Sequence, residues 1–340
     1  MTQLEKLIKP SGKAHFGLFP QGVEDVNYRD FDYRTNMDKP LSLKAKNRAF
    51  NQFQFVSFIS PELIVGLAIV DLKLVSNAFL YLYQPHTNSF EEYSFLQPFA
   101  FKTQFDTQPN QGLCEFKKGK KYFRIEATKT PGVRRVTVEI PNKVSIRASI
   151  DEFSQYHPLA ICTRAGYNGW VFTQKSNALP CEGQISWNNK QYNLKEIGAL
   201  AGVDWTGGFM RRETFWNWGS LSCTLKDGRK LGFNLAAGVN ETGFTENALW
   251  LDGRLIKVDM VDFQFDRYNP EALWHMRSND GIINLTFKPK GKRTDKTNAF
   301  IIASNFSQYF GLYQGEISLP NEVIKLNGEW GLSEDHYAKW

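Results

Sequence analysis

Apolar and polar residues alternate with a period of two along most of the chain. Clear examples are residues 52–55, 122–127 and 133–140, where apolar side chains recur at every second position. This alternation is typical of β-strands that bury one face, whereas an amphipathic helix repeats every three to four residues. The pattern therefore predicts an all-β protein of antiparallel strands with few, short helices.

Pairs of turn-forming residues punctuate the second half of the chain. Asx-Gly pairs favour the positive φ angles of tight hairpin turns, so they predict an antiparallel meander. One short helix is expected at residues 193–201, where Leu194, Ile197 and Ala201 would share a face. The turn pairs are Asn188-Asn189, Asp227-Gly228, Asp252-Gly253, Asp280-Gly281 and Asn327-Gly328.

The length of 340 residues exceeds the size at which a single hydrophobic core usually stops growing. Two domains or one large double-layered β structure is expected, and the 27 Phe, 13 Tyr and 9 Trp suit the cores of barrels and sandwiches. Pro and Gly are dense at residues 151–183. The predicted boundary lies near Gln174, which gives β domains at 1–174 and 175–340.

The net charge of +6 is a mild basic excess, and much of it falls in two runs, at residues 117–121 and 288–293. Each run contains Gly and is flanked by strand-like sequence, so each predicts a solvated hairpin loop. A nucleic-acid surface would interleave such charges with stacking aromatic residues, so no nucleic-acid partner is expected.

Several classes of site lack their sequence signature. The four cysteines form no Cys-x-x-Cys pair and the five histidines are scattered, so neither a metal site nor a disulfide framework is predicted. No phosphate loop or dinucleotide fingerprint is present, and no cofactor is expected. The N-terminus is too charged for a signal peptide, and the apolar stretch 63–70 is too short to span a bilayer, so a cytoplasmic location is expected.

The segment 203–218 is the strongest candidate for a site, because it combines an acid, two arginines and two tryptophans. If Asp227-Gly228 forms a two-residue loop, Trp218 lies opposite Ala237, and Trp216 and Trp218 share an apolar face. The opposite face would carry only small and amide residues, which suit a pocket wall, a solvated outer face or a tight contact between sheets. That face comprises Asn217, Gly232, Asn234, Gly238 and Asn240.

Asp204 has two opposed interpretations. Burial against tryptophan would raise its pKa and make it a general acid, whereas a clamp by Arg211 or Arg212 would make it a permanently ionised structural partner. Glu246 and Asn247 form a second polar cluster. The C-terminal Glu334-Asp335-His336 either forms a site or docks the tail, and docking is the favoured interpretation.

Several segments, spread over nearly the whole chain, resemble a bacterial family, the domain of unknown function numbered 2804. These segments are Tyr-Asn-Gly-Trp-Val-Phe-Thr-Gln-Lys (167–175), Trp-Asn-Trp-Gly (216–219), Gly-Phe-Asn-Leu (232–235), Thr-Glu-Asn-Ala (245–248) and Ser-Glu-Asp-His-Tyr-Ala-Lys-Trp (333–340). The family name implies no activity.

Asp204 with Trp216-Asn217-Trp218 and Asp227-Gly228 is more distantly similar to the lipocalin-like carotenoid hydratase and AttH group. This resemblance implies two calycin-like halves, each a lipocalin-like barrel or a sandwich. It also implies hydration, cyclisation or isomerisation of apolar substrates, with an acid near Asp204 that protonates a double bond.

Two functions of different class follow. The first is a cofactor-independent enzyme acting on an apolar, lipid- or isoprenoid-like small molecule, and the second is a non-catalytic carrier that uses the same pocket. In the enzyme Asp204 would be the acid. The predicted ligand contacts are Arg211, Arg212, Trp216, Trp218, Asn234, Asn240, Glu246 and Asn247.

Overall fold

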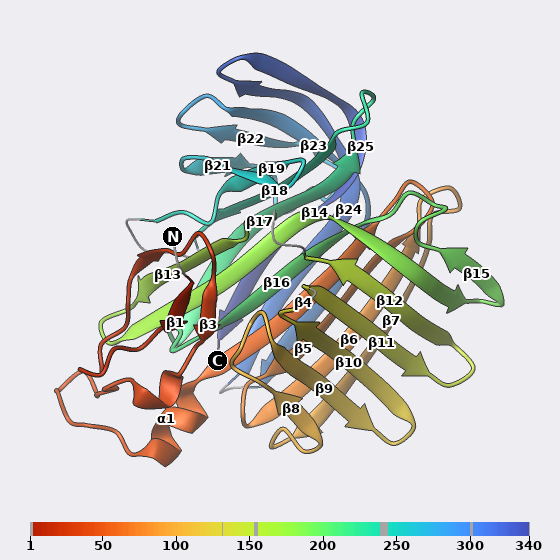
Figure 1. The fold of residues 1–340 in the computed structure, drawn as a ribbon. Coiled ribbons are helices and arrows are strands. Elements are labelled where there is room, and N and C mark those ends of the chain that lie inside the picture. Colours follow the sequence, from red (N-terminus) through yellow and green to blue (C-terminus); the bar gives the residue numbers. More distant parts are fainter. Residues whose placement is uncertain (1–2, 131, 153–155, 239–243, 300–301, 340) are drawn as a thin grey trace.

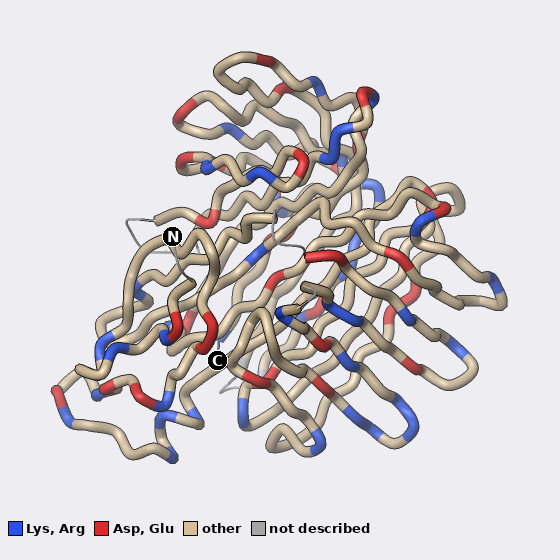
Figure 2. Tube along the Cα trace, in the orientation of Figure 1, with Lys and Arg blue, Asp and Glu red and all other residues tan. Residues whose placement is uncertain are grey.

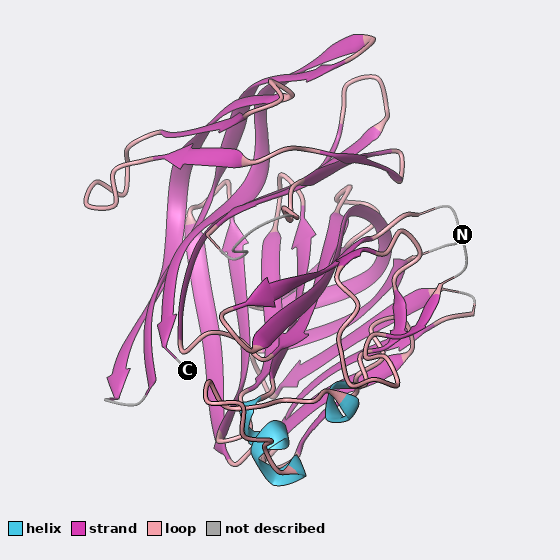
Figure 3. Cartoon of the chain, turned by 90° about the vertical axis from the view of Figure 1, so that its left-hand side faces the viewer, coloured by secondary structure: helices cyan, strands magenta, loops and turns pink. Residues whose placement is uncertain are grey.

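The computed structural model describes residues 3–130, 132–152, 156–238, 244–299 and 302–339. Two large antiparallel sheets and one two-stranded sheet account for most of this chain, which confirms the all-β prediction (Figure 1). The helices in the described ranges are α1 (Leu43–Ala49) and the 3-10 turn η1 (Tyr28–Asp30), both at one end of the molecule (Figure 3). Neither has the length and apolar character needed to cross a membrane.

The first sheet has fourteen strands and curls on itself. The two edges of the sheet lie close together: the Gln97 side-chain amide of β7, at one edge, donates to the Lys117 carbonyl of β9, next to the other edge, at 2.6 Å. Its main path runs β7-β6-β5-β4-β16-β14-β12-β11-β10-β9-β8, and β13, β15 and β2 branch from β14 and β13. The strands are β2 (Gly17–Leu18), β4 (Asn51–Ile59), β5 (Ile64–Asp71), β6 (Val75–Gln84), β7 (Ser89–Pro98), β8 (Thr103–Phe105), β9 (Gly112–Lys118), β10 (Lys121–Thr128), β11 (Val133–Ile140), β12 (Val144–Asp151), β13 (Leu159–Ala165), β14 (Gly169–Trp187), β15 (Lys190–Asn193) and β16 (Leu200–Gly208).

The second sheet has nine strands in the order β20-β19-β18-β17-β25-β24-β23-β22-β21. It forms a second, more open half-barrel above the first (Figure 1). Its strands are β17 (Glu213–Thr224), β18 (Lys230–Ala237), β19 (Ala248–Leu251), β20 (Arg254–Lys257), β21 (Val261–Gln264), β22 (Trp274–Ser278), β23 (Ile283–Ala299), β24 (Ile302–Leu319) and β25 (Glu322–Lys339).

Each half has its own apolar core, and a further apolar layer joins the halves. Alternate residues of a strand point to opposite faces, so β4 sends Val56 and Phe58 into the first core and Phe55 and Ile59 toward the second sheet. The joining layer also contains Trp218 and several residues of β5, β6, β18, β24 and β25. A fourth cluster packs the N-terminal segment, including β1 (Leu4–Lys6) and β3 (Val23–Asp25), against β13, β14 and β16.

The turn predictions have mixed outcomes. Asn188-Asn189 and Asp252-Gly253 form hairpin turns with both residues at positive φ, as predicted. Asn327-Gly328 instead lies inside β25, where the pairing with β24 shifts register and Gly328 has φ +123°. The Asn-Gly pair forms a β-bulge at that position. A glycine with positive φ occurs both in hairpin turns and in bulges, so the pair alone does not distinguish the two.

Two further predictions are corrected. Residues 193–201 contain a single turn rather than a helix, because Gly198 adopts φ +65° and the Ala199 amide returns to the Leu194 carbonyl at 2.9 Å. The basic run 117–121 does form the β9–β10 hairpin, but the run 288–293 lies within β23. A register shift between Pro289 and Gly291 accommodates the proline there, which lacks the amide hydrogen needed for regular pairing.

The division into domains at residue 174 stays a prediction. Gln174 lies inside β14, which is paired throughout with strands of the first sheet. The chain passes from the first sheet to the second between Gly208 and Glu213.

The two sheets come closest where β18 crosses β14. A Cβ atom on Gly232 would lie 2.8 Å from the Asn177 carbonyl carbon and 2.9 Å from the Ala178 nitrogen. Glycine is required at position 232 because backbone, rather than a flexible side chain, occupies that space.

We therefore expect Gly232→Ala to push the sheets apart and to destabilise the fold by about 1–3 kcal/mol, the usual cost of overpacking. Urea unfolding measures this change. An unchanged free energy of unfolding would show that the sheets do not depend on this close approach.

Candidate functional site

The β17–β18 hairpin has a three-residue loop instead of the predicted two-residue loop. The Leu225 amide donates to the Arg229 carbonyl at 2.8 Å, and Gly228 has φ +91°. A type I turn followed by a left-handed glycine is a common hairpin loop of this length. The extra residue shifts the pairing by one position.

The shift places Trp218 opposite Ala236 rather than Ala237. Trp218 and Asn234 thereby share the face that looks toward the first sheet, and the Trp218 indole nitrogen donates to the Asn234 carbonyl oxygen at 2.6 Å. The predicted separation of tryptophan and amide faces is wrong. Asn217 points to the other side, where its amide donates to Asp335 at 3.1 Å.

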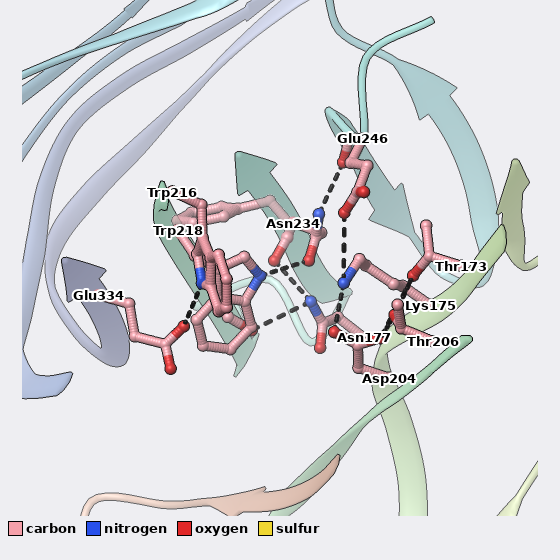
Figure 4. Close-up of polar contacts among 12 residues, drawn as sticks. Thr173, Lys175, Asn177, Asp204, Thr206, Trp216, Trp218, Asn234, Glu246 and Glu334 are labelled. Carbon is pink, nitrogen blue, oxygen red and sulfur yellow. Dashed lines mark hydrogen bonds and ion pairs between the residues drawn. The ribbon is translucent and has the colours of Figure 1, made fainter. Parts of the chain in front are cut away.

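A buried ion cluster lies between the sheets, centred on Lys175 (Figure 4). The Lys175 ammonium pairs with the Asp204 carboxylate on the neighbouring strand and with Glu246 at 3.3 Å. The Thr206 hydroxyl donates to the other Asp204 oxygen at 2.8 Å, and Thr173 contacts the same oxygen at 3.3 Å. Burial works to lower the pKa of Lys175, but the two carboxylates outweigh burial and raise it.

The surroundings of Asp204 are those of a structural ion-pair partner. Its carboxylate pairs with a buried cation and contacts two hydroxyls. The cation is Lys175, not either of the predicted arginines. Arg211 lies against Gly166 beyond the end of β16, and Arg212 is exposed in the same connection.

The remaining predicted ligand contacts separate into two groups. Glu246 belongs to the ion cluster, and its backbone carbonyl also accepts from the Asn234 amide at 2.6 Å. Asn247 supports the backbone, since its side-chain oxygen accepts from the Ala236 amide at 2.7 Å and its amide donates to the Asp259 carbonyl at 2.9 Å. Asn240 lies outside the described residues.

A small cavity separates the ion cluster from Trp218. Its volume of about 10 Å³ suits one water molecule, and its walls offer hydroxyl, amide and carboxylate groups. It is lined by Phe55, Ser57, Asn177, Gly202, Val203, Asp204, Trp218, Ser220 and Asn234.

Glu334 of β25 is the titratable acid that the sequence interpretation assigned to tail docking. Its two carboxylate oxygens accept from the Trp216 indole nitrogen at 3.2 Å and from the Gln308 amide at 3.0 Å. Burial raises the pKa of Glu334 to about 7, against the lowering effects of Trp216 and Arg293. Strand alternation in the sequence is the signal that could have revealed the burial of Glu334. It places Glu334 on the same face of β25 as Leu332, which is fully buried between the sheets.

Polar atoms without a hydrogen-bond partner surround this carboxyl. The buried Gln308 side-chain oxygen and the His336 Nδ1 are two such atoms among the described residues. His336 packs its ring 4.2 Å from that of Trp216, and burial lowers its pKa to about 3, so the ring is neutral near pH 7. A buried polar group without a partner is costly, and these two atoms lie on side chains that contact Glu334 and Trp216.

Metal ligation has no support in the described ranges, where no group of three His, Cys, Asp or Glu side chains could hold an ion. All four cysteines are unpaired.

Comparison with known proteins gives a family and a fold. The model of a family described as a domain of unknown function, DUF2804, matches residues 1–340. No curated protein matches the sequence. The structure of CghA with Sch210972 aligns over 98% of this chain and 97% of that one, with 8% identity and a TM-score of 0.59. Kievitone hydratase from Nectria haematococca aligns over 96% and 99%, with 10% identity and a TM-score of 0.51. These likenesses confirm the predicted lipocalin-like architecture of two halves.

The ion cluster predicts a large penalty for losing its cation. Lys175→Met would leave two buried carboxylates facing each other, and we expect a loss of about 3–5 kcal/mol in the free energy of unfolding. Lys325→Met, which removes the exposed pair with Glu316, is the matched control and should cost under about 1 kcal/mol. Equal losses in urea unfolding would contradict the burial argument.

The raised pKa of Glu334 predicts a pH dependence of stability. In the unfolded chain its pKa is about 4.3, so the folded state holds the proton more tightly between that value and about 7. Its contribution to stability is therefore fully present below pH 4 and is lost as the pH rises to 7, on the order of 3 kcal/mol.

Glu334→Gln should consequently stabilise the fold at pH 8 and make little difference at pH 4. Urea unfolding of both proteins across this range gives the difference. A difference that does not change with pH would contradict the assigned titration.

Proposed function

This chain belongs to the DUF2804 family, and we propose that it is a cofactor-independent, hydratase-like enzyme that acts on an apolar small molecule between its two sheets. The kinship of fold with kievitone hydratase supports the class of reaction. The observation that carries the proposal is Glu334, a carboxyl group that titrates near neutral pH beside two tryptophans.

Glu334 suits the role of general acid because its pKa of about 7 keeps a large protonated fraction at neutral pH. An acid of ordinary pKa would be almost wholly ionised there. Trp216 and Gln308 each donate a hydrogen bond to one oxygen of Glu334, and the two bonds hold its carboxyl group in one orientation. Glu334 thus takes the role that the sequence interpretation gave to Asp204.

The proposed reaction adds water across a carbon–carbon double bond. Glu334 transfers its proton to one alkene carbon, so an O–H bond breaks, a C–H bond forms and positive charge develops on the other carbon. The faces of Trp216 and Trp218 would stabilise that cation through their π electrons. A water oxygen then bonds to the cationic carbon, and its proton returns to the Glu334 carboxylate.

Asp204, Glu246 and Lys175 contribute electrostatics instead of proton transfer. Two carboxylates and the Lys175 ammonium form the cluster, and the Lys257 ammonium also interacts with Glu246. Asp204 lines the cavity beside Trp218, where a carboxylate would favour a cationic transition state over a neutral ground state. Asn234 holds the Trp218 indole and thereby the wall of the site.

The described space between the sheets is too small for an apolar substrate. Its volume of about 10 Å³ holds no more than one water molecule, whereas small-molecule sites span roughly 300–1,000 Å³. Trp216, Glu334 and His336 are only partly buried, so the substrate would enter from their side and lie against the Trp216 indole. Trp218, which lines the water cavity, pairs with Glu334 in the sheet register.

A non-catalytic carrier is the alternative. It would use the same aromatic wall but would not depend on a titrating carboxyl, so substitution of Glu334 separates the two functions.

We expect the purified protein to hydrate members of a panel of apolar alkenes, including isoprenoids and prenylated aromatics, detected as the mass gain of one water. Glu334→Gln should lower kcat by about 10²-fold or more while ligand binding, followed by tryptophan fluorescence, persists. Turnover should fall as the pH rises through about 7, because the acid loses its proton.

Glu316→Gln, on the exposed face of β24, is the matched control and should leave turnover unchanged. Binding without turnover in the unmodified protein would support the carrier. Full turnover in Glu334→Gln would overturn the assignment of the acid.

A further inference from the structure

Two neighbouring turns at one end of the first sheet expose large apolar side chains. Leu74 lies in the β5–β6 turn, Leu96 near the end of β7, and Phe99 and Phe101 in the β7–β8 connection, with exposed fractions of 46, 58, 78 and 62%. The turns are tied together, because the Phe99 amide donates to the Leu74 carbonyl at 2.8 Å. We refer to these four exposed residues as the apolar patch.

The backbone of these turns is held in an unfavourable conformation. Phe99, Ala100 and Lys102 have φ of +54°, +50° and +53°, and Lys73 in the facing turn has φ +64°. Residues with a Cβ rarely adopt left-handed φ, and a bulky aromatic residue does so least. Strain of this kind is concentrated at functional sites, and the Phe99 side chain that it accompanies is 78% exposed.

A group of lysines borders the apolar patch. The Lys118 ammonium donates to the Leu96 carbonyl at 2.8 Å, the Lys117 amide donates to the Lys102 carbonyl at 3.1 Å, and the Lys102 ammonium lies 5.4 Å from the Phe101 ring centre. The lysines of both turns and of the adjoining β9–β10 hairpin are Lys73, Lys102, Lys117, Lys118, Lys120 and Lys121.

These six lysines outnumber the carboxylates beside them. Two of them form ion pairs, Lys73 with Asp71 and Lys117 with Glu115, and the other four form none within the described chain. The patch therefore keeps an excess positive charge, visible at the tip of the β9–β10 hairpin in Figure 2.

We propose that this end of the first sheet docks on an anionic lipid bilayer. Phe99, Phe101 and Leu96 would enter the interface between headgroups and acyl chains, and the lysines would contact the anionic headgroups. A bilayer matches both features at once. It also yields around protruding turns, whereas a protein partner would need a preformed hollow of the same shape.

This inference goes beyond the proposed enzymatic activity and stands without it. If an apolar substrate resides in membranes, docking would bring the enzyme to it, but the contact depends only on the turns and the lysines. The two proposals can therefore fail separately.

The test is co-sedimentation of the full chain with phosphatidylcholine vesicles that contain about a third phosphatidylglycerol or none. We expect binding to the anionic vesicles at least about tenfold stronger than to the neutral ones, and weakened by high salt. Phe99→Asn with Phe101→Ser should reduce binding about tenfold, as should Lys118→Glu with Lys120→Glu. Asparagine tolerates left-handed φ, so the first variant should fold.

Two control variants replace residues of the same kind elsewhere. Tyr268→Ser removes an aromatic residue that is 92% exposed in the second half, and Lys290→Glu with Lys292→Glu alters the other basic run. Both should bind as the unmodified chain does. Absence of sedimentation, equal effects in all variants, or a dimer that the Phe99 and Phe101 substitutions dissociate would overturn the proposal.

Discussion

The buried ammonium of Lys175 is one of two buried cations that join the two sheets, the other being Arg293 of β23, which pairs with Glu92 of β7 at 2.6 Å. The carboxylate partners of Lys175 come from different parts of the chain: Asp204 lies on the neighbouring strand, and Glu246 lies in the second half just before β19. A buried charge that loses its partners is far more costly than a lost surface contact. A placement of the sheets in which all three charges meet is therefore strongly favoured, and the small cavity lies beside them.

Glycines at the contact between the sheets allow this close placement, because they have no side chain there. A Cβ on Gly232 would meet the backbone at Asn177, and one on Gly202 would lie 2.4 Å from the Asn177 side-chain oxygen. Asn177 in turn donates to the Phe233 carbonyl at 2.6 Å, so the same residue that forces glycine on its neighbours also hydrogen-bonds across the gap. Stability and the polar lining of the cavity thus share their residues.

Much of the fold could be predicted from the sequence, because period-two alternation is a local property and the aromatic content indicates the kind of core. The segment 203–218 could also be singled out as a candidate, since its acid and tryptophans are close in sequence, and its role as a site stays a prediction. The partner of Asp204 could not be predicted, because Lys175 is 29 residues away and only the pairing of β14 with β16 joins them. The predicted register of the β17–β18 hairpin was wrong, because Asp227-Gly228 suits both two- and three-residue loops. One added loop residue moves each side chain of β18 to the opposite face relative to β17. Glu334 was placed among tail residues because its burial depends on a sheet that begins 121 residues earlier, at Glu213.

The pairing of β4 with β16 has a consequence for synthesis of the chain. One edge of β4 pairs with β5, but the other waits for residues 200–208. At about 5–20 residues per second, β4 stays open on that edge for roughly 7–30 seconds after it leaves the ribosome. An unpaired apolar edge is a template for aggregation. During that interval the nascent chain is exposed to mispairing along this edge, a vulnerability that the finished protein no longer shows.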